Sequence, residues 1–165
     1  MYKAEHKKTN QQVVIKIAST FNTFTNTDRL PDEVRILLQL YNAPGIISLL
    51  DFYCTQCYYF LIFKQESHLD LHNYLQINGP LNENSCRTVV IQLFCAFNYL
   101  NKQGILHGDI KDDNILINPI YLDTKLLILD ELYPFTPKTM TTFLGPLLLL
   151  LQNIFPLINL KQHPI

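Results

Sequence analysis

The sequence lacks the features that would indicate a nucleic-acid-binding or secreted protein. Its formal net charge is −1, and it has neither a basic run nor basic residues interleaved with aromatic ones. The composition therefore favours no nucleic-acid partner. The N-terminal segment 1–8 lacks the apolar stretch of a signal peptide, so we expect an intracellular protein, cytoplasmic or nuclear. With 48% hydrophobic residues, the chain still has enough apolar surface for a folded core.

Cysteine is also scarce, and its small number argues against a disulfide framework. The four cysteines are Cys54, Cys57, Cys86 and Cys95, and so few without a secretion signal suit a reducing compartment. Cys54 and Cys57 have C-x-x-C spacing, but a zinc site needs a second ligand pair. No Cys or His pair with ligand spacing supplies it, so we interpret both residues as structural or incidental.

The order of apolar patterns predicts alternating strands and helices. Short β-branched or aromatic runs indicate strands, and apolar residues at i, i+3, i+4 and i+7 indicate helices. Strands are expected at 12–18, 46–53, 58–63, 115–117 and 125–129, with helices at 31–41, 69–77 and 84–102. The first helix should bury Val34, Leu37, Leu38 and Tyr41, and the last Val89, Leu93, Phe97 and Leu100.

The most informative segment runs from His107 to Asn118. It reads H-x-D-x-K-x-x-N and leads into a β-branched and leucine run, which predicts a polar loop feeding a buried strand. Phosphoryl transfer needs a carboxylate to orient the attacking hydroxyl, a cation near the moving phosphoryl, and an Asn to help hold Mg²⁺. Asp109, Lys111 and Asn114 supply these groups. The alternative is a polar turn without chemistry.

This segment resembles the catalytic loop of eukaryotic protein kinases. The element order is similar to the kinase fold from its second or third strand to the start of the activation segment, roughly over residues 1–132. Lys111, two residues after Asp109, resembles serine/threonine rather than tyrosine kinases. Several short motifs look like those of the PIM group: Pro31-x-Glu33-Val34, Ile47-x-Leu49-Leu50-Asp51 and Gly104-Ile105-Leu106-His107.

The resemblance implies an α+β fold, a partial protein kinase domain. Residues 1–65 would form a partial N-lobe with the hinge, 66–135 a partial C-lobe with the catalytic loop, and 136–165 a divergent apolar tail. ATP and Mg²⁺ would be the cofactors, with Asn114 and Asp130 as metal ligands. Implied nucleotide-binding residues are Lys16, Glu33, Ile62, Phe63 and Gln65.

Lys16 is also unusual independently of the kinase resemblance, because it is a charged residue within a predicted apolar strand. A lysine inside a β-branched strand costs desolvation unless its ammonium meets an anion. Glu33, on the next predicted helix, is in register to face inward, so we predict a Lys16–Glu33 ion pair. The alternative is a lysine that snorkels to water from an edge strand while Glu33 stays solvated.

Several departures from the kinase pattern make activity doubtful. Asp130 is followed by Glu131 and Leu132 instead of the Phe and Gly of D-F-G, so it could also be only a turn residue. Gly108 stands where kinases commonly have arginine, so activity should not depend on loop phosphorylation. No G-x-G-x-x-G precedes Lys16 and no A-P-E follows Asp130. We therefore expect phosphoryl transfer well below typical kinase rates.

The C-terminal part contains a long uncharged stretch, 143–160. Its length raises the question of a membrane span. Gly, Pro, Gln and Asn residues interrupt or polarise it, so we expect a sticky apolar tail and no membrane insertion.

Three functions thus stay open on sequence grounds. The first is a serine/threonine protein kinase, impaired in this short chain. The second is a non-catalytic, pseudokinase-like module that binds a partner, or nucleotide weakly. The third is a small-molecule phosphotransferase, favoured only by His107-Gly108-Asp109. The protein substrate, the partner and the oligomeric state have no signal in the sequence.

Overall fold

The computed structural model describes residues 1–19, 30–66, 68–128 and 149, together with the backbone of 132–134. The chain divides into two compact units, Met1–Ser67 and His68–Ile165. Within the described ranges, none of the helices combines the length and the apolar character needed to span a bilayer. The uncharged stretch 143–160 lies outside the described residues, except for Leu149.

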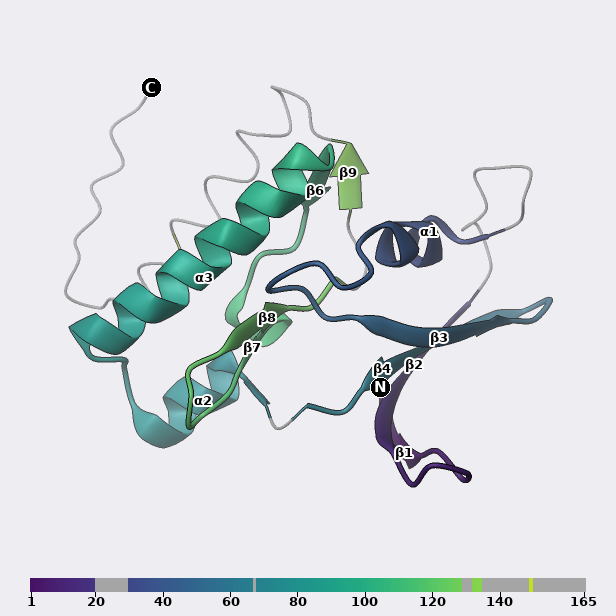
Figure 1. Cartoon of the computed structure of the whole chain (residues 1–165), viewed down its shortest axis with the longest axis horizontal. Helices are drawn as coiled ribbons and strands as arrows, with labels where there is room; N and C mark the ends of the chain where they lie inside the picture. Colours follow the sequence, from purple (N-terminus) through teal and green to yellow (C-terminus); the bar gives the residue numbers. More distant parts are fainter. Residues whose placement is uncertain (20–29, 67, 129–131, 135–148, 150–165) are drawn as a thin grey trace. The chain divides into compact units, whose positions relative to one another are not determined.

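The described residues of the first unit form an antiparallel sheet and one helix (Figure 1). Its strands are β1 (Tyr2–Glu5), β2 (Gln12–Ser19), β3 (Leu49–Cys54) and β4 (Tyr58–Lys64), in the order β1-β2-β4-β3. The predicted strands 12–18, 46–53 and 58–63 are confirmed as β2, β3 and β4, although β3 begins three residues later than expected. Strands β3 and β4 pair antiparallel as a hairpin. Strand β1 was not predicted, because it is short and mostly exposed.

Helix α1 (Asp32–Gln39) follows β2 and contacts β3. It buries Val34 and Leu37, as predicted, but Leu38 and Tyr41 are 45% and 60% exposed. The prediction for Tyr41 was wrong because the helix ends at Gln39, so Tyr41 lies beyond it. The prediction for Leu38 was wrong because this residue, although inside the helix, is on its exposed side. Leu40, the C-cap residue, is buried in their place.

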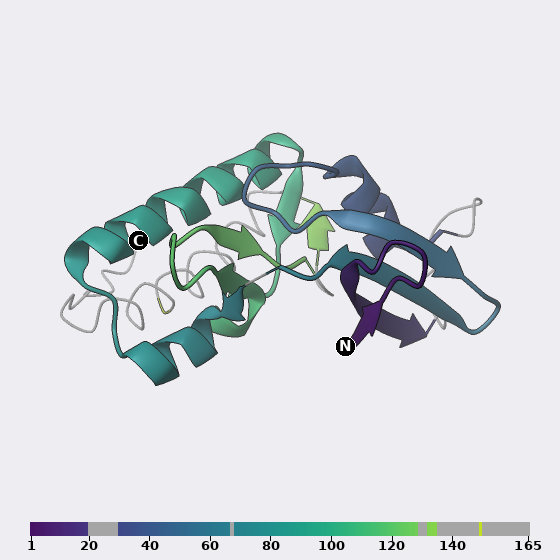
Figure 2. The ribbon, with the colours of Figure 1, turned by 60° about the horizontal axis from the view of Figure 1, so that its bottom comes forward.

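The described residues of the second unit form the helices α2 (Leu71–Asn78) and α3 (Glu83–Lys102) and five short strands, shown from a second side in Figure 2. Strands β5 (Leu69–Asp70), β7 (Ile115–Ile117) and β8 (Thr124–Leu126) form one sheet. Strands β6 (Ile105–His107) and β9 (Leu132–Pro134) form another. A 3₁₀ turn, η1 (Asp112–Asn114), precedes β7.

Helix α3 packs its apolar face against the strands of this unit. It contacts both β6 and β8, and its predicted face, Val89, Leu93, Phe97 and Leu100, is buried. It ends before Gly104, whose φ of +71° is the left-handed conformation that a helix C′ position favours. The prediction for α2 was partly wrong, because the extended Asp70 caps the helix by accepting from Asn73 N–H, so helix begins only at Leu71.

Candidate active site

The H-x-D-x-K-x-x-N segment lies between two buried strands of the second unit. Strand β6 ends at His107, and β7 begins at Ile115, directly after η1. Ile105 and Leu106 on one side, and Ile115 and Ile117 on the other, are buried. These apolar anchors fix both ends of the loop and leave its polar residues to be positioned by hydrogen bonds.

Asp109 is the centre of those hydrogen bonds. Its Oδ2 lies 2.7 Å from Lys111 Nζ and accepts a hydrogen bond of 2.7 Å from Asn114 Nδ2. The three side chains of the motif, those of Asp109, Lys111 and Asn114, therefore lie together in the structure. The Lys111 ammonium, with help from Asn114, holds the pKa of the Asp109 carboxyl below its usual range, although partial burial opposes this. Asp109 is thus an ionised carboxylate at neutral pH, able to accept a hydrogen bond from a hydroxyl group.

Asn114 is buried and uses its amide nitrogen within the loop. Nδ2 donates to the backbone oxygen of Asp109 at 2.8 Å as well as to the Asp109 carboxylate. With both amide hydrogens engaged, the carboxamide oxygen is the group left to serve as a ligand. Oxygen ligands suit Mg²⁺, so this residue fits the predicted metal role. Asp130, the other predicted ligand, lies outside the described residues.

The buried His107 side chain fixes the position of the loop through two hydrogen bonds. It is 4% exposed, and its Nε2 lies 2.8 Å from the carbonyl oxygen of Leu127, while Asp109 N–H donates to Nδ1 at 3.3 Å. A carbonyl oxygen accepts only, so Nε2 must carry the hydrogen and Nδ1 must be bare. The ring is therefore neutral, consistent with the lowering of the His107 pKa by burial.

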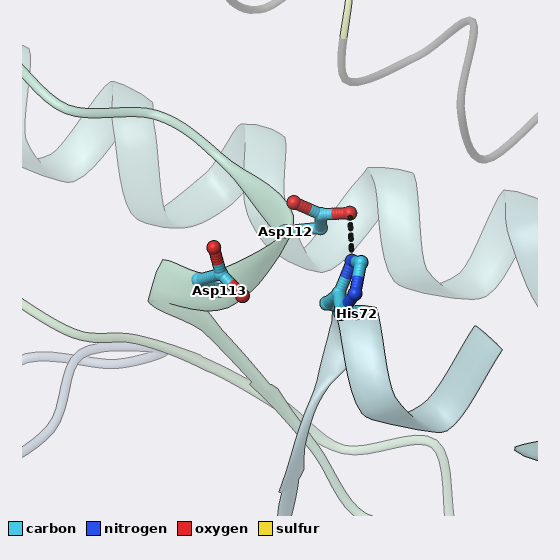
Figure 3. Close-up of side chains that lie close together, drawn as sticks. All are labelled: His72, Asp112 and Asp113. Carbon is cyan, nitrogen blue, oxygen red and sulfur yellow. Dashed lines mark hydrogen bonds and ion pairs between the residues drawn. The ribbon is translucent and has the colours of Figure 1, made fainter. Parts of the chain in front are cut away.

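A second polar cluster lies beside the loop and was not predicted. His72, in the first turn of α2, points toward Asp112 and Asp113 of η1 (Figure 3). His72 Nδ1 is 3.1 Å from Asp112 Oδ2, and one ligand-type atom from each of the three residues lies within 4.8 Å of the others. The hydrogen bond to Asp112 raises the His72 pKa. The contact joins α2 to the loop across 40 residues of sequence, a separation that no local pattern reveals.

In the first unit, Lys16 and Glu33 form the predicted ion pair. Lys16 Nζ is 3.0 Å from Glu33 Oε1, and the two side chains are 12% and 10% exposed. The geometric prediction is confirmed. A third residue, Tyr59, was missed: its hydroxyl donates to Glu33 Oε2 at 2.7 Å. An aromatic residue on a strand has the same pattern as a core residue, so no sequence signal could identify this contact.

The remaining predicted nucleotide-binding residues lie on β4 or just after it. Phe63 is buried in the core, Ile62 is half-buried, and the backbone N–H of Gln65 donates to the Gln12 carbonyl at 3.1 Å. Lys16 and Glu33 belong to the first unit and Asp109 to the second. The binding and catalytic roles of all these residues stay predictions.

Comparison with known proteins identifies the family. A family model described as "Protein kinase domain" matches residues 1–130. The chain is 34% identical over 115 residues to the probable serine/threonine-protein kinase KIN1 homolog of Enterocytozoon bieneusi, covering 70% of this chain and 19% of that one. It is 32% identical over 115 residues to the serine/threonine-protein kinase RAD53 of Saccharomyces cerevisiae, covering 70% of this chain and 14% of the relative.

A solved structure supports the fold directly. The crystal structure of Rad53 in complex with AMP-PNP matches with a TM-score of 0.65 at 27% identity, covering 78% of this chain and 33% of that one. The predicted α+β, partial kinase-like fold is thereby confirmed. The chain spans well under half the length of each of these proteins. Because the family model covers most of the sequence, this chain belongs to the protein kinase family, as a partial kinase domain with serine/threonine kinase relatives.

Proposed function

We propose that this protein acts in ATP-dependent phosphoryl transfer to serine or threonine residues of proteins, with impaired activity in the 165-residue chain. The observation that carries the proposal is the convergence of Lys111 and Asn114 on the Asp109 carboxylate. Phosphoryl transfer depends mainly on positioning and on charge stabilisation, and this loop supplies both kinds of group.

Each residue of the loop has a distinct part in the proposal. Asp109, kept ionised by its neighbours, accepts a hydrogen bond from the substrate hydroxyl and orients its oxygen toward the phosphoryl group. Lys111, whose ammonium already lies beside Asp109, stabilises negative charge on the transferred group. His107 and Asn114 hold the Asp109 backbone, so that the carboxylate is presented in one orientation.

The nucleotide roles belong to the first unit. Lys16, paired with Glu33, would contact the α- and β-phosphates, and Ile62, Phe63 and Gln65 would line the nucleotide site. Asn114 and Asp130 would hold Mg²⁺, which neutralises phosphate charge when it is bound. The AMP-PNP in the Rad53 complex supports the proposal of an ATP-type ligand here.

The sequence after Asp130 supports the proposed impairment. Glu131 and Leu132 replace an aromatic residue and a glycine, and glycine supplies backbone freedom at such a turn. Asp130 should therefore turn less readily toward a metal. The same feature favours the second candidate function, a pseudokinase-like module that binds nucleotide or a partner without transferring phosphate.

Two narrower assignments also stay predictions. The relatives named above are KIN1-type and Rad53 kinases, so the likeness to the PIM group rests on the short motifs alone. A small-molecule phosphotransferase is favoured only by His107-Gly108-Asp109, and Lys111 favours a protein substrate instead.

A transfer assay tests the proposal. Purified, monodisperse protein is incubated with Mg²⁺ and γ-labelled ATP, together with serine- and threonine-containing peptides. We expect transfer slower than about 1 s⁻¹, the low end of typical kinase rates. Asp109→Asn should abolish it, and Asp123→Asn, which changes an exposed loop carboxylate of the same unit, should not.

The possible results separate the candidates. Slow transfer that requires Asp109 supports the impaired kinase. Nucleotide binding without any transfer supports the pseudokinase-like module. Transfer that survives Asp109→Asn would contradict the role given to the catalytic loop, and transfer at typical kinase rates would contradict the impairment.

A further inference from the structure

The Glu33 carboxylate is held at both of its oxygen atoms. Lys16 Nζ contacts Oε1 at 3.0 Å, and the Tyr59 hydroxyl donates to Oε2 at 2.7 Å. Tyr59 is 4% exposed, so its hydroxyl meets the carboxylate away from bulk water. A hydrogen bond to an ionised group in such surroundings is stronger than a neutral one.

The strand register explains why Tyr59 can reach Glu33. In the ladder between β2 and β4, Lys16 lies opposite Leu61, and Ala18 lies opposite Tyr59. Directly opposed residues point to the same face of a sheet, so Lys16 and Tyr59 are diagonal neighbours on one face. That face also carries the buried Leu61. The Glu33 side chain, on α1, therefore contacts both the Lys16 ammonium and the Tyr59 hydroxyl. The sheet fixes the separation of these two groups.

From this geometry we infer that Tyr59 is a positioning residue for the Lys16–Glu33 pair. Its hydroxyl keeps the Glu33 carboxylate turned toward Lys16 before any nucleotide binds. The first unit then presents the ammonium in a preformed orientation, which lowers the ordering cost of nucleotide binding. The inference rests on the proposed function for its consequence, because Tyr59 acts only through Glu33 and Lys16.

The alternative is that Tyr59 merely fills the core. Packing alone would be satisfied equally well by phenylalanine, which has the same ring without the hydroxyl. Tyr59→Phe therefore removes the hydrogen bond and keeps the apolar volume. Tyr58→Phe is the matched control, because the neighbouring tyrosine on β4 is exposed and points to the other face.

The first measurement uses the protein without nucleotide. Carbon-13 NMR of labelled glutamate carboxyls, assigned with Glu33→Gln, follows the titration of Glu33. Loss of a hydrogen bond to the charged form raises a carboxyl pKa. We expect Tyr59→Phe to raise the Glu33 pKa and Tyr58→Phe to leave it unchanged. An unchanged Glu33 pKa in a folded Tyr59→Phe protein overturns the inference, whether or not the chain binds ATP.

The second measurement is the Mg²⁺·ATP dissociation constant by calorimetry. Tyr59→Phe should weaken binding about fivefold or more, because hydrogen bonds to charged groups are among the stronger ones. In a Glu33→Gln background the same substitution should have no further effect, since the hydroxyl acts through the carboxylate. An equal loss in both backgrounds would show a purely structural role. If the unsubstituted protein binds no ATP while the Glu33 pKa still shifts, the proposed function fails and the positioning contact stands.

Discussion

At the scale of single residues, two histidines show how the same side chain takes opposite roles beside one loop. His107 is buried and neutral, with Nε2–H donating to the Leu127 carbonyl. His72 is half-exposed and faces the Asp112 carboxylate, which favours the protonated ring. Burial lowers the pKa of His107, and the hydrogen bond that His72 donates to the Asp112 carboxylate raises the pKa of His72.

The two histidines should therefore titrate in opposite directions from the free-histidine value of about 6.5. Two-dimensional NMR of the imidazole carbons, assigned with His107→Gln and His72→Gln, measures both. We expect the His107 pKa below that value and the His72 pKa above it. Equal pKa values for the two rings would contradict the hydrogen bonding described for the loop.

The same shifts determine how each histidine contributes to stability. For His107 the unfolded chain binds the proton more tightly, so its contribution is present above the unfolded pKa and is lost as the pH falls through the folded pKa. For His72 the folded chain binds the proton more tightly, so its contribution is present at low pH and is lost as the pH rises through the raised pKa.

The charge on Asp109 depends chiefly on Lys111. Lys111→Met removes the ammonium and keeps much of the aliphatic side chain, so the Asp109 pKa should rise toward its ordinary value. Carboxyl NMR titration measures the change. Lys102→Met, in the last turn of α3, is the matched control and should leave the Asp109 pKa where it is. A lowered pKa that persists in Lys111→Met would show that Asn114 alone holds the carboxylate.

At the scale of elements, helix α3 is tied to strand β8 by one polar side chain. Gln92 donates from Nε2 to the Leu122 carbonyl, and its Oε1 accepts from both the backbone N–H and the hydroxyl of Thr124. Thr124 is buried at the start of β8, so its N–H and hydroxyl groups depend on Gln92 for the hydrogen bonds that water would otherwise provide. Strand β8 pairs with β7, which follows directly from the catalytic loop. Gln92 therefore helps to fix the strand on which the loop ends.

Gln92→Ala should destabilise the protein by about 1–3 kcal/mol, because it leaves buried polar groups of Thr124 without their acceptor. Chemical denaturation followed by circular dichroism measures the loss. Gln76→Ala, on the exposed side of α2, should change the free energy of unfolding by less than about 0.5 kcal/mol. Equal effects of the two substitutions would mean that the α3–β8 contact contributes little.

The elements that sequence reasoning predicted are those with a clear period or a long apolar run. Helix α3 and its buried face, the β3–β4 hairpin and strand β2 belong to this group. Strands β6 and β9 have three residues each, too few to show a period, and were not predicted. Strand β7 is equally short, but it was predicted because its β-branched and leucine run directly follows the polar loop. Helix α1 shows the limit of periodicity: a pattern assigns a face, but the early end of the helix decided which residues that face contains.

Within the candidate site, the sequence predicted only contacts between residues close together in the chain, or contacts of a residue that is unusual at its position. Asp109, Lys111 and Asn114 lie within six residues of each other, and Lys16 is a charge in an apolar strand. The contacts of Tyr59 with Glu33 and of His72 with Asp112 span 26 and 40 residues. They depend on strand register and on the docking of α2, which a single sequence does not display.

At the scale of the whole molecule, the proposed chemistry is divided between two compact units. The first holds the Lys16–Glu33–Tyr59 set, and the second holds the loop around Asp109. Either unit alone contains only part of what phosphoryl transfer needs. Nucleotide binding is the property that the impaired kinase requires and that a nucleotide-binding, pseudokinase-like module would share.

The most direct test of the account is the effect of Mg²⁺·ATP on thermal unfolding. A ligand that binds only the folded state stabilises it by mass action, by about 2.7 kcal/mol at a hundredfold excess over the dissociation constant. We predict that saturating Mg²⁺·ATP raises the unfolding temperature of this protein and of Lys8→Met, a change in an exposed turn, and fails to raise that of Lys16→Met. An unchanged unfolding temperature for the unsubstituted protein, or an equal rise in Lys16→Met, would contradict it.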